Sequence, residues 1–198
     1  MPSVPLSVEE VRAAIAGVYS WESPDDDNTL LVGDMWWRDL EKRYVKRLTA
    51  AGIDEASAVN AASGMRREIQ RPERYFIYDD TFDMLRLAHE RGYLNILLTN
   101  NHPDMHKLCE TLGLAPYLDG YAVSGLIGYD KPRREIFRAA LDMAGNPEPS
   151  ACLMVGDNPV SDIAGAEAAG IPAVLVHKKA EGVLRYSDNL RGIEPLLV

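Results

Sequence analysis

The sequence has few cysteines and no long apolar run. Cys109 and Cys152 are the two cysteines among 198 residues, and both lie in apolar segments, where a thiol acts as a small hydrophobic group. We therefore do not expect a disulfide. No apolar run approaches the ~20 residues that a membrane-spanning helix needs, and the first residues lack the basic and apolar segments of a secretory signal. These absences predict a cytoplasmic protein with no membrane partner.

Basic residues are scarce relative to acidic ones. The chain has 21 lysines and arginines against 30 aspartates and glutamates, which leaves a net charge of -9. Binding to nucleic acid or to an anionic membrane surface requires clustered basic side chains that displace counterions. We therefore expect no nucleic acid partner, and a small molecule or another protein instead.

The remaining composition is that of a globular protein. Hydrophobic residues make up 46% of the chain and charged residues 26%. A length of 198 residues suits one buried core, or one core with a modest insertion, because domains cluster near ~100–150 residues.

Three amphipathic helices are expected in the first part of the chain. Ser7 and Glu10 have the spacing of a capping box, and apolar residues follow at helical intervals, which predicts a helix over residues 7–19. A second helix is expected over residues 33–52, and a third over residues 54–70. The second helix carries an apolar stripe along one face: Trp36, Leu40, Tyr44 and Leu48.

From Tyr75 onward the pattern changes to helices that alternate with short apolar strands. The expected helices cover residues 79–92, 103–113, 133–145 and 159–170, and the expected strands cover residues 94–99, 121–124, 151–155 and 172–176. Strands without polar alternation, joined by helices, are typical of a parallel sheet that is covered on both faces. The sequence therefore predicts an α/β fold for this part.

Polar residues follow three of the expected strands. Thr99 and Asn100 end the first, Lys131 lies in a loop after the second, and Asp157 ends the third, with Asp162 in the next helical turn. Ligands of open parallel sheets bind beyond these strand ends, so the five residues are candidates for one site. Each also has a structural interpretation, as a helix cap, a solvated lysine or a charge beside a helix dipole. Their ordered appearance at successive strand ends favours a site.

The segments LLTNN, YDKPRREIF and MVGDNPVSDIAGAEAAGI resemble the second, third and fourth motifs of the haloacid dehalogenase-like (HAD) hydrolase superfamily. The resemblance runs from about Tyr75 to Val198 and favours the class with a helical cap. It implies a Rossmann-like parallel sheet core over residues 73–198 and a small α-helical cap over residues 1–72. It also implies phosphomonoester hydrolysis, with a small phosphorylated metabolite as substrate.

The resemblance assigns a role to each candidate residue. Thr99 would bind the transferring phosphoryl group beside Asn100, and Lys131 would neutralise that group and the nucleophile. Asp157 would bind Mg²⁺, and Asp162 would orient Lys131 or complete the metal site. Thr99, Asn100 and Lys131 are thus the expected catalytic residues, and Asp157 and Asp162 the expected metal residues. An acid at Asp157 favours a magnesium-dependent phosphatase over a metal-free dehalogenase.

The segment PDDDNT has the spelling of the superfamily's first motif, in which an aspartate after a buried strand attacks phosphorus. Asp25 would then be the nucleophile and Asp27 the general acid. The preceding residues 19–24, YSWESP, contain serine, glutamate and proline where a central strand needs apolar residues. We favour a cap loop, with Asp25 far from Lys131.

On that interpretation the chain lacks the first strand and the nucleophile, and two explanations stay open. The gene product could begin upstream of Met1, or the chain could be a non-catalytic binding or regulatory relative. In the second case the sheet rearranges or pairs with another chain, and a homodimer is one way to fill the empty place. The substrate is not predicted. Trp36 and Trp37 could line its pocket, but packing in the cap's own core is favoured.

Overall fold

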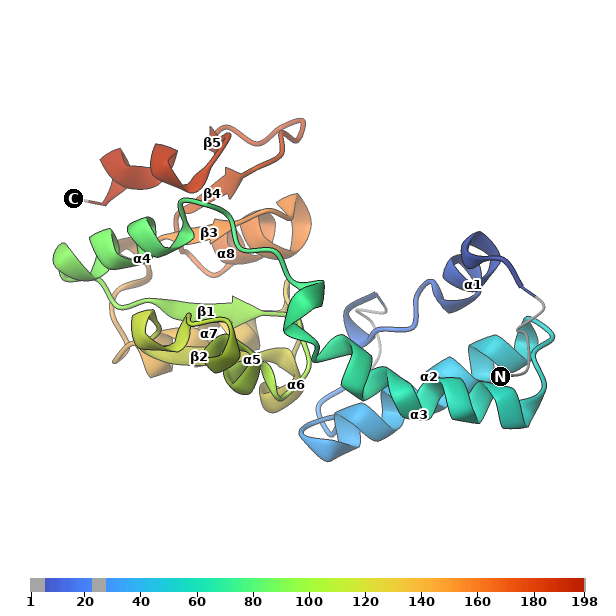
Figure 1. The fold of residues 1–198 in the computed structure, drawn as a ribbon. Coiled ribbons are helices and arrows are strands. Elements are labelled where there is room, and N and C mark those ends of the chain that lie inside the picture. Colours follow the sequence, from blue (N-terminus) through green and yellow to red (C-terminus); the bar gives the residue numbers. More distant parts are fainter. Residues whose placement is uncertain (1–5, 23–27, 198) are drawn as a thin grey trace.

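The computed structural model describes residues 6–22 and 28–197. Figure 1 shows two parts, a helical region with α1, α2 and α3, and an α/β region with all strands and the remaining helices. We define the helical region as residues 6–22 and 28–70, and the α/β region as residues 75–197. Within the described residues, no helix combines the length and the apolar character needed to cross a membrane. Asp25 and Asp27 lie outside the described residues.

All three helices predicted for the helical region are confirmed. The elements are α1 (Val8–Ile15), η1 (Ser20–Glu22), α2 (Asp34–Ala50), α3 (Glu55–Ile69) and the linking turn η2 (Pro72–Arg74). The capping box is also confirmed, because the Glu10 N–H donates to Ser7 Oγ at 3.2 Å and the Ser7 N–H donates to Glu10 Oε2 at 2.7 Å. Helix α1 ends before the predicted residue 19, since Gly17 has a φ of 73°, which a helix cannot continue.

The core of the helical region is built on α2. Trp36, Trp37 and Leu40 are buried together with Val18 and Met65, and the two tryptophan rings contact each other edge to face at 5.0 Å. The predicted stripe is therefore correct, and Trp36 and Trp37 are buried in this core. Aromatic rings in this arrangement bury a large apolar area at fixed geometry.

The predicted alternation of helix and strand is confirmed in the α/β region. Its elements in chain order are α4 (Thr81–Glu90), β1 (Ile96–Thr99), α5 (Met105–Thr111), η3 (Ala115–Tyr117), β2 (Gly120–Val123), α6 (Ser124–Ile127), α7 (Arg134–Met143), η4 (Pro149–Ala151), β3 (Met154–Gly156), the π-helical turn η5 (Pro159–Ala164), α8 (Gly165–Ala168), β4 (Ala173–Val176), β5 (Tyr186–Ser187) and η6 (Leu190–Leu196). The short helices α6, η3 and η4 and the elements after β4 were not predicted.

The five strands form two parallel sheets. Strand β1 pairs with β2, and β3 pairs with β4, which in turn pairs with β5. Among the described residues, β1 and β3 each have a bonded neighbour on one side only. We call the interval between β1 and β3 the sheet break; both strands are visible in Figure 1. The predicted parallel, Rossmann-like α/β fold is thus present, with its sheet divided.

Helix α7 joins the two sheets on one face. Its buried Ile136 and Phe137 belong to a cluster that contains Met154 of β3, and Leu98 of β1 packs against the same cluster. The next residues along these strands point to the opposite face, because side chains alternate along a strand. There, Leu97 packs with α5 and Val155 packs with α4, in two separate clusters.

Candidate active site

The loops that follow β1 and α6 are held together by one amide side chain. Asn100 Oδ1 accepts a hydrogen bond from the Lys131 N–H at 2.7 Å, and Asn100 Nδ2 donates to the Lys131 carbonyl oxygen at 3.0 Å. These two bonds reach the N–H and the carbonyl group of the same residue and fix the position of the lysine backbone. Asn100 and Lys131 therefore contact each other beyond the end of β1, and their expected catalytic roles stay predictions.

The Lys131 side chain forms a buried ion pair with Asp162. Lys131 Nζ lies 2.7 Å from Asp162 Oδ1, and the two side chains are 9% and 5% exposed. The same ammonium donates to the Leu98 carbonyl oxygen of β1 at 2.9 Å. Because an isolated buried charge is costly, each partner depends on the other to remain in the interior.

Asp162 also organises the loop after β3. Its Oδ2 accepts the backbone N–H groups of Asp157 and Asn158 at 3.0 and 2.9 Å, and the Ser161 hydroxyl donates to Oδ1 at 3.3 Å. A Cβ on Gly156 would collide with this carboxylate, so the loop requires glycine there. Both oxygens of Asp162 are thus engaged, which suits a positioning residue. Its predicted role in binding metal stays a prediction.

The Asp157 carboxylate is exposed and pairs with a different lysine. It lies 3.0 Å from Lys178 Nζ, and the two side chains are 64% and 56% exposed. Within the part of the chain that the structure describes, no group of three or more histidine, cysteine, aspartate or glutamate side chains could hold a metal ion. Asp157 fits Mg²⁺ as a single carboxylate ligand, which suffices when phosphate and water supply the other oxygens.

Thr99 is the last residue of β1 and pairs in register with Val123 of β2. Its neighbour Asn100 contacts Lys131, and Lys131 contacts Asp162, so the predicted residues from three loops are linked in one chain of contacts. The Asp157 backbone joins this chain, whereas its carboxylate does not. The arrangement places Thr99 at the end of β1 and the buried Lys131 ammonium beside the Leu98 carbonyl oxygen of the same strand, where an anion can be bound.

Sequence reasoning missed Asp104, which links the two regions. Its Oδ2 accepts three hydrogen bonds from the helical region: Trp37 Nε1 at 2.9 Å, Arg66 Nη2 at 2.9 Å and Gln70 Nε2 at 2.7 Å. Lys107 Nζ donates to Oδ1 at 3.1 Å. Burial alone would raise the pKa of Asp104, but the bonds from Lys107, Trp37 and Arg66 outweigh it and lower the pKa to about 2.

His102 lies at the same junction and was also missed. Its side chain is fully buried 5.2 Å from the Trp37 ring, and neither ring nitrogen has a hydrogen-bond partner among the described residues. Burial lowers the pKa of His102 to about 4, so the ring is neutral at pH 7. The signal available in the sequence was proximity, since His102 and Asp104 lie in the loop that follows Thr99.

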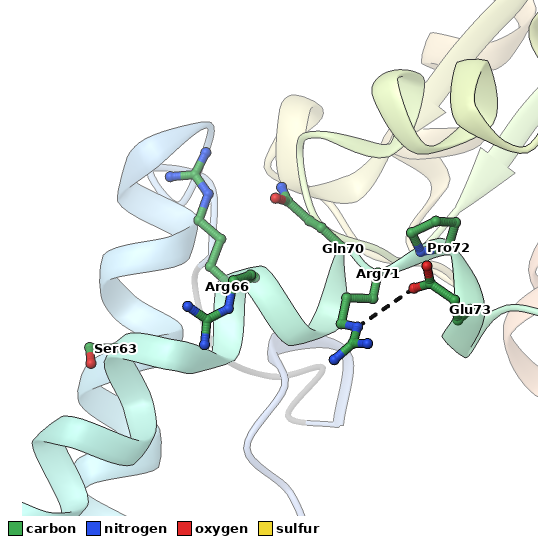
Figure 2. Close-up of a pocket in the computed structure, with 7 residues that line it drawn as sticks. Ser63, Arg66, Gln70, Arg71, Pro72 and Glu73 are labelled. Carbon is green, nitrogen blue, oxygen red and sulfur yellow. Dashed lines mark ion pairs between the residues drawn. The ribbon is translucent and has the colours of Figure 1, made fainter.

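A hollow lies at the end of α3. Figure 2 shows its lining and the ion pair between Arg71 and Glu73, whose charged atoms are 3.5 Å apart. The hollow has a volume of about 600 Å³ and is lined by Ser63, Arg66, Arg67, Gln70, Arg71, Pro72 and Glu73. Arg66 is already bound to Asp34 and Asp104. The chemistry at the strand ends, rather than this arginine-lined hollow, therefore marks the candidate site.

Two relatives that are named as phosphatases or nucleotidases match parts of the chain. It is 36% identical over 141 residues to a phosphoserine phosphatase from Thermus thermophilus, which covers 70% of this chain and 54% of the relative. It is 41% identical over 83 residues to the pyrimidine 5'-nucleotidase YjjG from Escherichia coli, which covers 41% of this chain and 37% of the relative. The chain thus spans little more than half, or less, of the relatives that it matches.

Solved structures share the fold. The HAD hydrolase YfnB from Bacillus subtilis, bound to magnesium, superposes with a TM-score of 0.70 at 18% identity, which covers 98% of this chain and 85% of that one. A family model described as haloacid dehalogenase-like hydrolase matches residues 3–170. The motif resemblance, the fold and this match agree, and the chain belongs to the haloacid dehalogenase-like hydrolase family.

Proposed function

We propose that this chain binds small phosphorylated metabolites at the strand ends and carries the phosphate-binding part of a magnesium-dependent phosphatase. The observation that supports this best is the buried Lys131–Asp162 pair at 2.7 Å, held in place by Asn100. The related phosphoserine phosphatase and pyrimidine 5'-nucleotidase act on phosphate monoesters, which supports the substrate class.

Each residue has a distinct role in this proposal. The Lys131 ammonium stabilises the charge on the phosphoryl oxygens, and the Thr99 hydroxyl donates a hydrogen bond to one of them. Asn100 and Asp162 are positioning residues, because the first fixes the Lys131 backbone and the second its side chain. Because the Lys131 ammonium is already in position, it does not have to rearrange when the phosphate binds.

Mg²⁺, when bound, would withdraw charge from the phosphoryl oxygens. Asp157 would hold it together with phosphate and water oxygens. We expect weak binding, because Asp157 contributes one carboxylate and Lys178 competes for it at 3.0 Å. Titration calorimetry with Mg²⁺ alone should show no micromolar site. Micromolar affinity that survives Asp157→Ala would contradict this assignment.

Hydrolysis by the family's covalent route also needs a carboxylate beside Lys131 that is free to attack. Asp162 cannot serve, because Lys131 and two backbone N–H groups occupy both of its oxygens. The second candidate function is a phosphate-binding protein without turnover, which applies if neither Asp25 nor Asp27, both outside the described residues, supplies the attacking carboxylate. Asp25→Asn and Asp27→Asn variants separate the two, since loss of aryl phosphatase activity in either would make that residue part of the catalytic site.

Phosphate binding is tested with inorganic phosphate by titration calorimetry. Lys131→Met should weaken binding at least tenfold, because it removes the buried positive charge. Lys179→Met is the matched control, since Lys179 lies 5.2 Å over the Tyr186 ring, outside the site. Thr99→Val tests the site without touching the buried ion pair and should weaken binding severalfold. Unchanged affinity in both Lys131→Met and Thr99→Val would overturn the proposal.

A further inference from the structure

The helical region and the α/β region meet at the loop between β1 and α5. Asp104 in this loop accepts hydrogen bonds at one carboxylate oxygen, Oδ2, from three side chains of the helical region: Trp37, Arg66 and Gln70. We call Asp104, these three partners and His102 the junction. Because the three bonds converge on one oxygen atom, a separation of the two regions at this point breaks all of them.

His102 lies inside the junction as an uncompensated polar ring. Its side chain has no exposed surface, and its ring is tilted by 30° against the Trp37 ring at 5.2 Å. In the part of the chain that the structure describes, Nδ1 and Nε2 both lack a hydrogen-bond partner. Burial of a polar group without a partner costs free energy, which a leucine or phenylalanine at this position would avoid. The ring would therefore gain hydrogen bonds if the junction opened to water.

The charged groups that face His102 act in opposite directions. Asp104, on the same loop, favours a protonated ring, whereas Arg66, on α3, disfavours it. Trp37, on α2, presents an uncharged ring to His102. Burial is the strongest influence and lowers the pKa of His102 from 6.5 to about 4. The closed junction, as the structure shows it, therefore contains the neutral ring at pH 7.

The Asp104 carboxylate has no capacity left for a protonated His102. Its Oδ2 accepts three hydrogen bonds from the helical region, and Oδ1 accepts one from Lys107 Nζ at 3.1 Å. A carboxylate offers about four acceptor sites, so an imidazolium could pair with Asp104 only by displacing a donor. In an open junction the donors of the helical region leave, and Asp104 becomes available to a charged ring two residues away. The neutral ring thus suits the closed junction, and the charged ring suits the open one.

We propose that His102 is a pH-dependent switch between the two regions: a neutral ring keeps the helical region bound to the α/β region, and uptake of a solvent proton by the ring separates them while both stay folded. The inference does not rest on the proposed function, because it concerns contacts between the regions and not phosphate.

The size of the effect follows from linkage between proton binding and opening. In the closed junction the His102 pKa is about 4, and in an open junction the ring would return to its ordinary value of 6.5. Since the open form binds the proton more tightly, acid favours opening. Lowering the pH from 7 to 5 should raise the ratio of open to closed molecules roughly twentyfold.

Hydrogen exchange followed by NMR on the full chain tests the proposal. The Trp37 indole N–H donates to Asp104 Oδ2 at 2.9 Å, so its exchange reports opening of the junction. Its protection factor, which corrects for the intrinsic pH dependence of exchange, should fall about twentyfold between pH 7 and pH 5. The amide of Val174, inside β4, reports global unfolding. It should be at least tenfold better protected at both pH values, and low urea should accelerate its exchange much more than that of Trp37.

A pair of histidine variants identifies the group that binds the proton. His102→Leu should abolish the pH dependence of Trp37 protection. His106→Leu is the matched control and should retain it, because His106 is a half-buried histidine of α5 outside the junction. Persistence of the pH dependence in His102→Leu would overturn the proposal. Equal protection and equal urea dependence of Trp37 and Val174 would also overturn it, since the regions would then separate only on global unfolding.

A second measurement needs no variant and applies even if His102→Leu fails to fold. NMR titration of the His102 ring in the unaltered chain should give a pKa near 4, as burial in the closed junction requires. A ring that titrates near 6.5 in the folded chain, without loss of Trp37 protection, would show that its proton does not open the junction.

Discussion

The helical region and the α/β region bury their apolar side chains under different constraints. A helix satisfies its backbone hydrogen bonds internally, so α1, α2 and α3 need only side-chain contacts, and Trp37 and Ala58 are buried to 2% and 0% exposure. A strand needs neighbours. Strand β4 has two and is buried, and β1 has one and is half-exposed. The absence of a neighbouring strand therefore affects the backbone hydrogen bonds of a sheet, whereas the backbone hydrogen bonds of a helix do not depend on a neighbour.

The largest expected effect concerns the buried ion pair of the α/β region. Asp162→Asn leaves the Lys131 charge without a counterion, which should lower the free energy of unfolding by about 3–5 kcal/mol. Urea unfolding followed by circular dichroism measures it. Asp157→Asn is the matched control, because the exposed Asp157–Lys178 pair should contribute about 1 kcal/mol or less. Equal losses in both variants would show that the pair does not hold the divided sheet together.

The junction between the regions should respond to acid through His102. Its pKa falls from 6.5 to about 4 on folding, so the unfolded chain binds the proton first. Stability is therefore full above pH 6.5 and decreases by up to about 3 kcal/mol as the pH falls to 4. Urea midpoints at several pH values measure this. His102→Leu should remove this contribution to the pH dependence of the free energy of unfolding. If the pH dependence is unchanged in that variant, His102 is not its source.

A smaller effect is expected at Asp104, which joins the two regions. Asp104→Asn removes a charge that accepts bonds from Trp37, Arg66 and Gln70, and should cost about 2 kcal/mol. The three tryptophans all precede residue 38, so their emission reports on the helical region. We expect a red shift at lower urea than in the unaltered chain. Asp83→Asn, at an exposed pair with Arg191, should leave the emission midpoint nearly unchanged.

The smallest effect is confined to the helical region. Ser7→Ala removes the capping hydroxyl of α1 and should cost about 1 kcal/mol. The Glu10 N–H donates to Ser7 Oγ, so faster hydrogen exchange of this amide measures the local loss of helix stability. Ser63→Ala is the control, because Ser63 lies inside α3 and bonds the Asn60 carbonyl of its own helix. A global fall in stability from Ser7→Ala would mean that α1 unfolds together with the rest of the chain.

Local patterns predicted the elements well, because their causes are local. The capping box at Ser7 and the apolar stripe on α2 involve residues three or four apart, which neighbouring turns bring together. The polar residues after each apolar strand marked the candidate site for a similar reason, since parallel strands end at one edge. Asn100, Lys131 and Asp162 meet there.

Other features depended on contacts between distant segments and could not be predicted. Asp104 binds Trp37, which lies 67 residues away in the sequence, and nothing near either residue indicates the pairing. The same holds for His102 against the Trp37 ring. The Asp157 carboxylate pairs with Lys178, although its position after β3 suggested that it would face the other site residues.

The sequence by itself determined the order of helices and strands, the family and the residues of the candidate site, because periodicity and motifs are carried by neighbouring residues. The tertiary structure alone decided how these parts meet. In that structure the strands form two sheets, and both carboxylate oxygens of Asp162 have partners. The helical region is hydrogen-bonded to Asp104. These contacts join elements that are far apart in the sequence. They depend on which polar groups and apolar faces still need a partner after the helices and strands have formed, so no local sequence pattern predicts them.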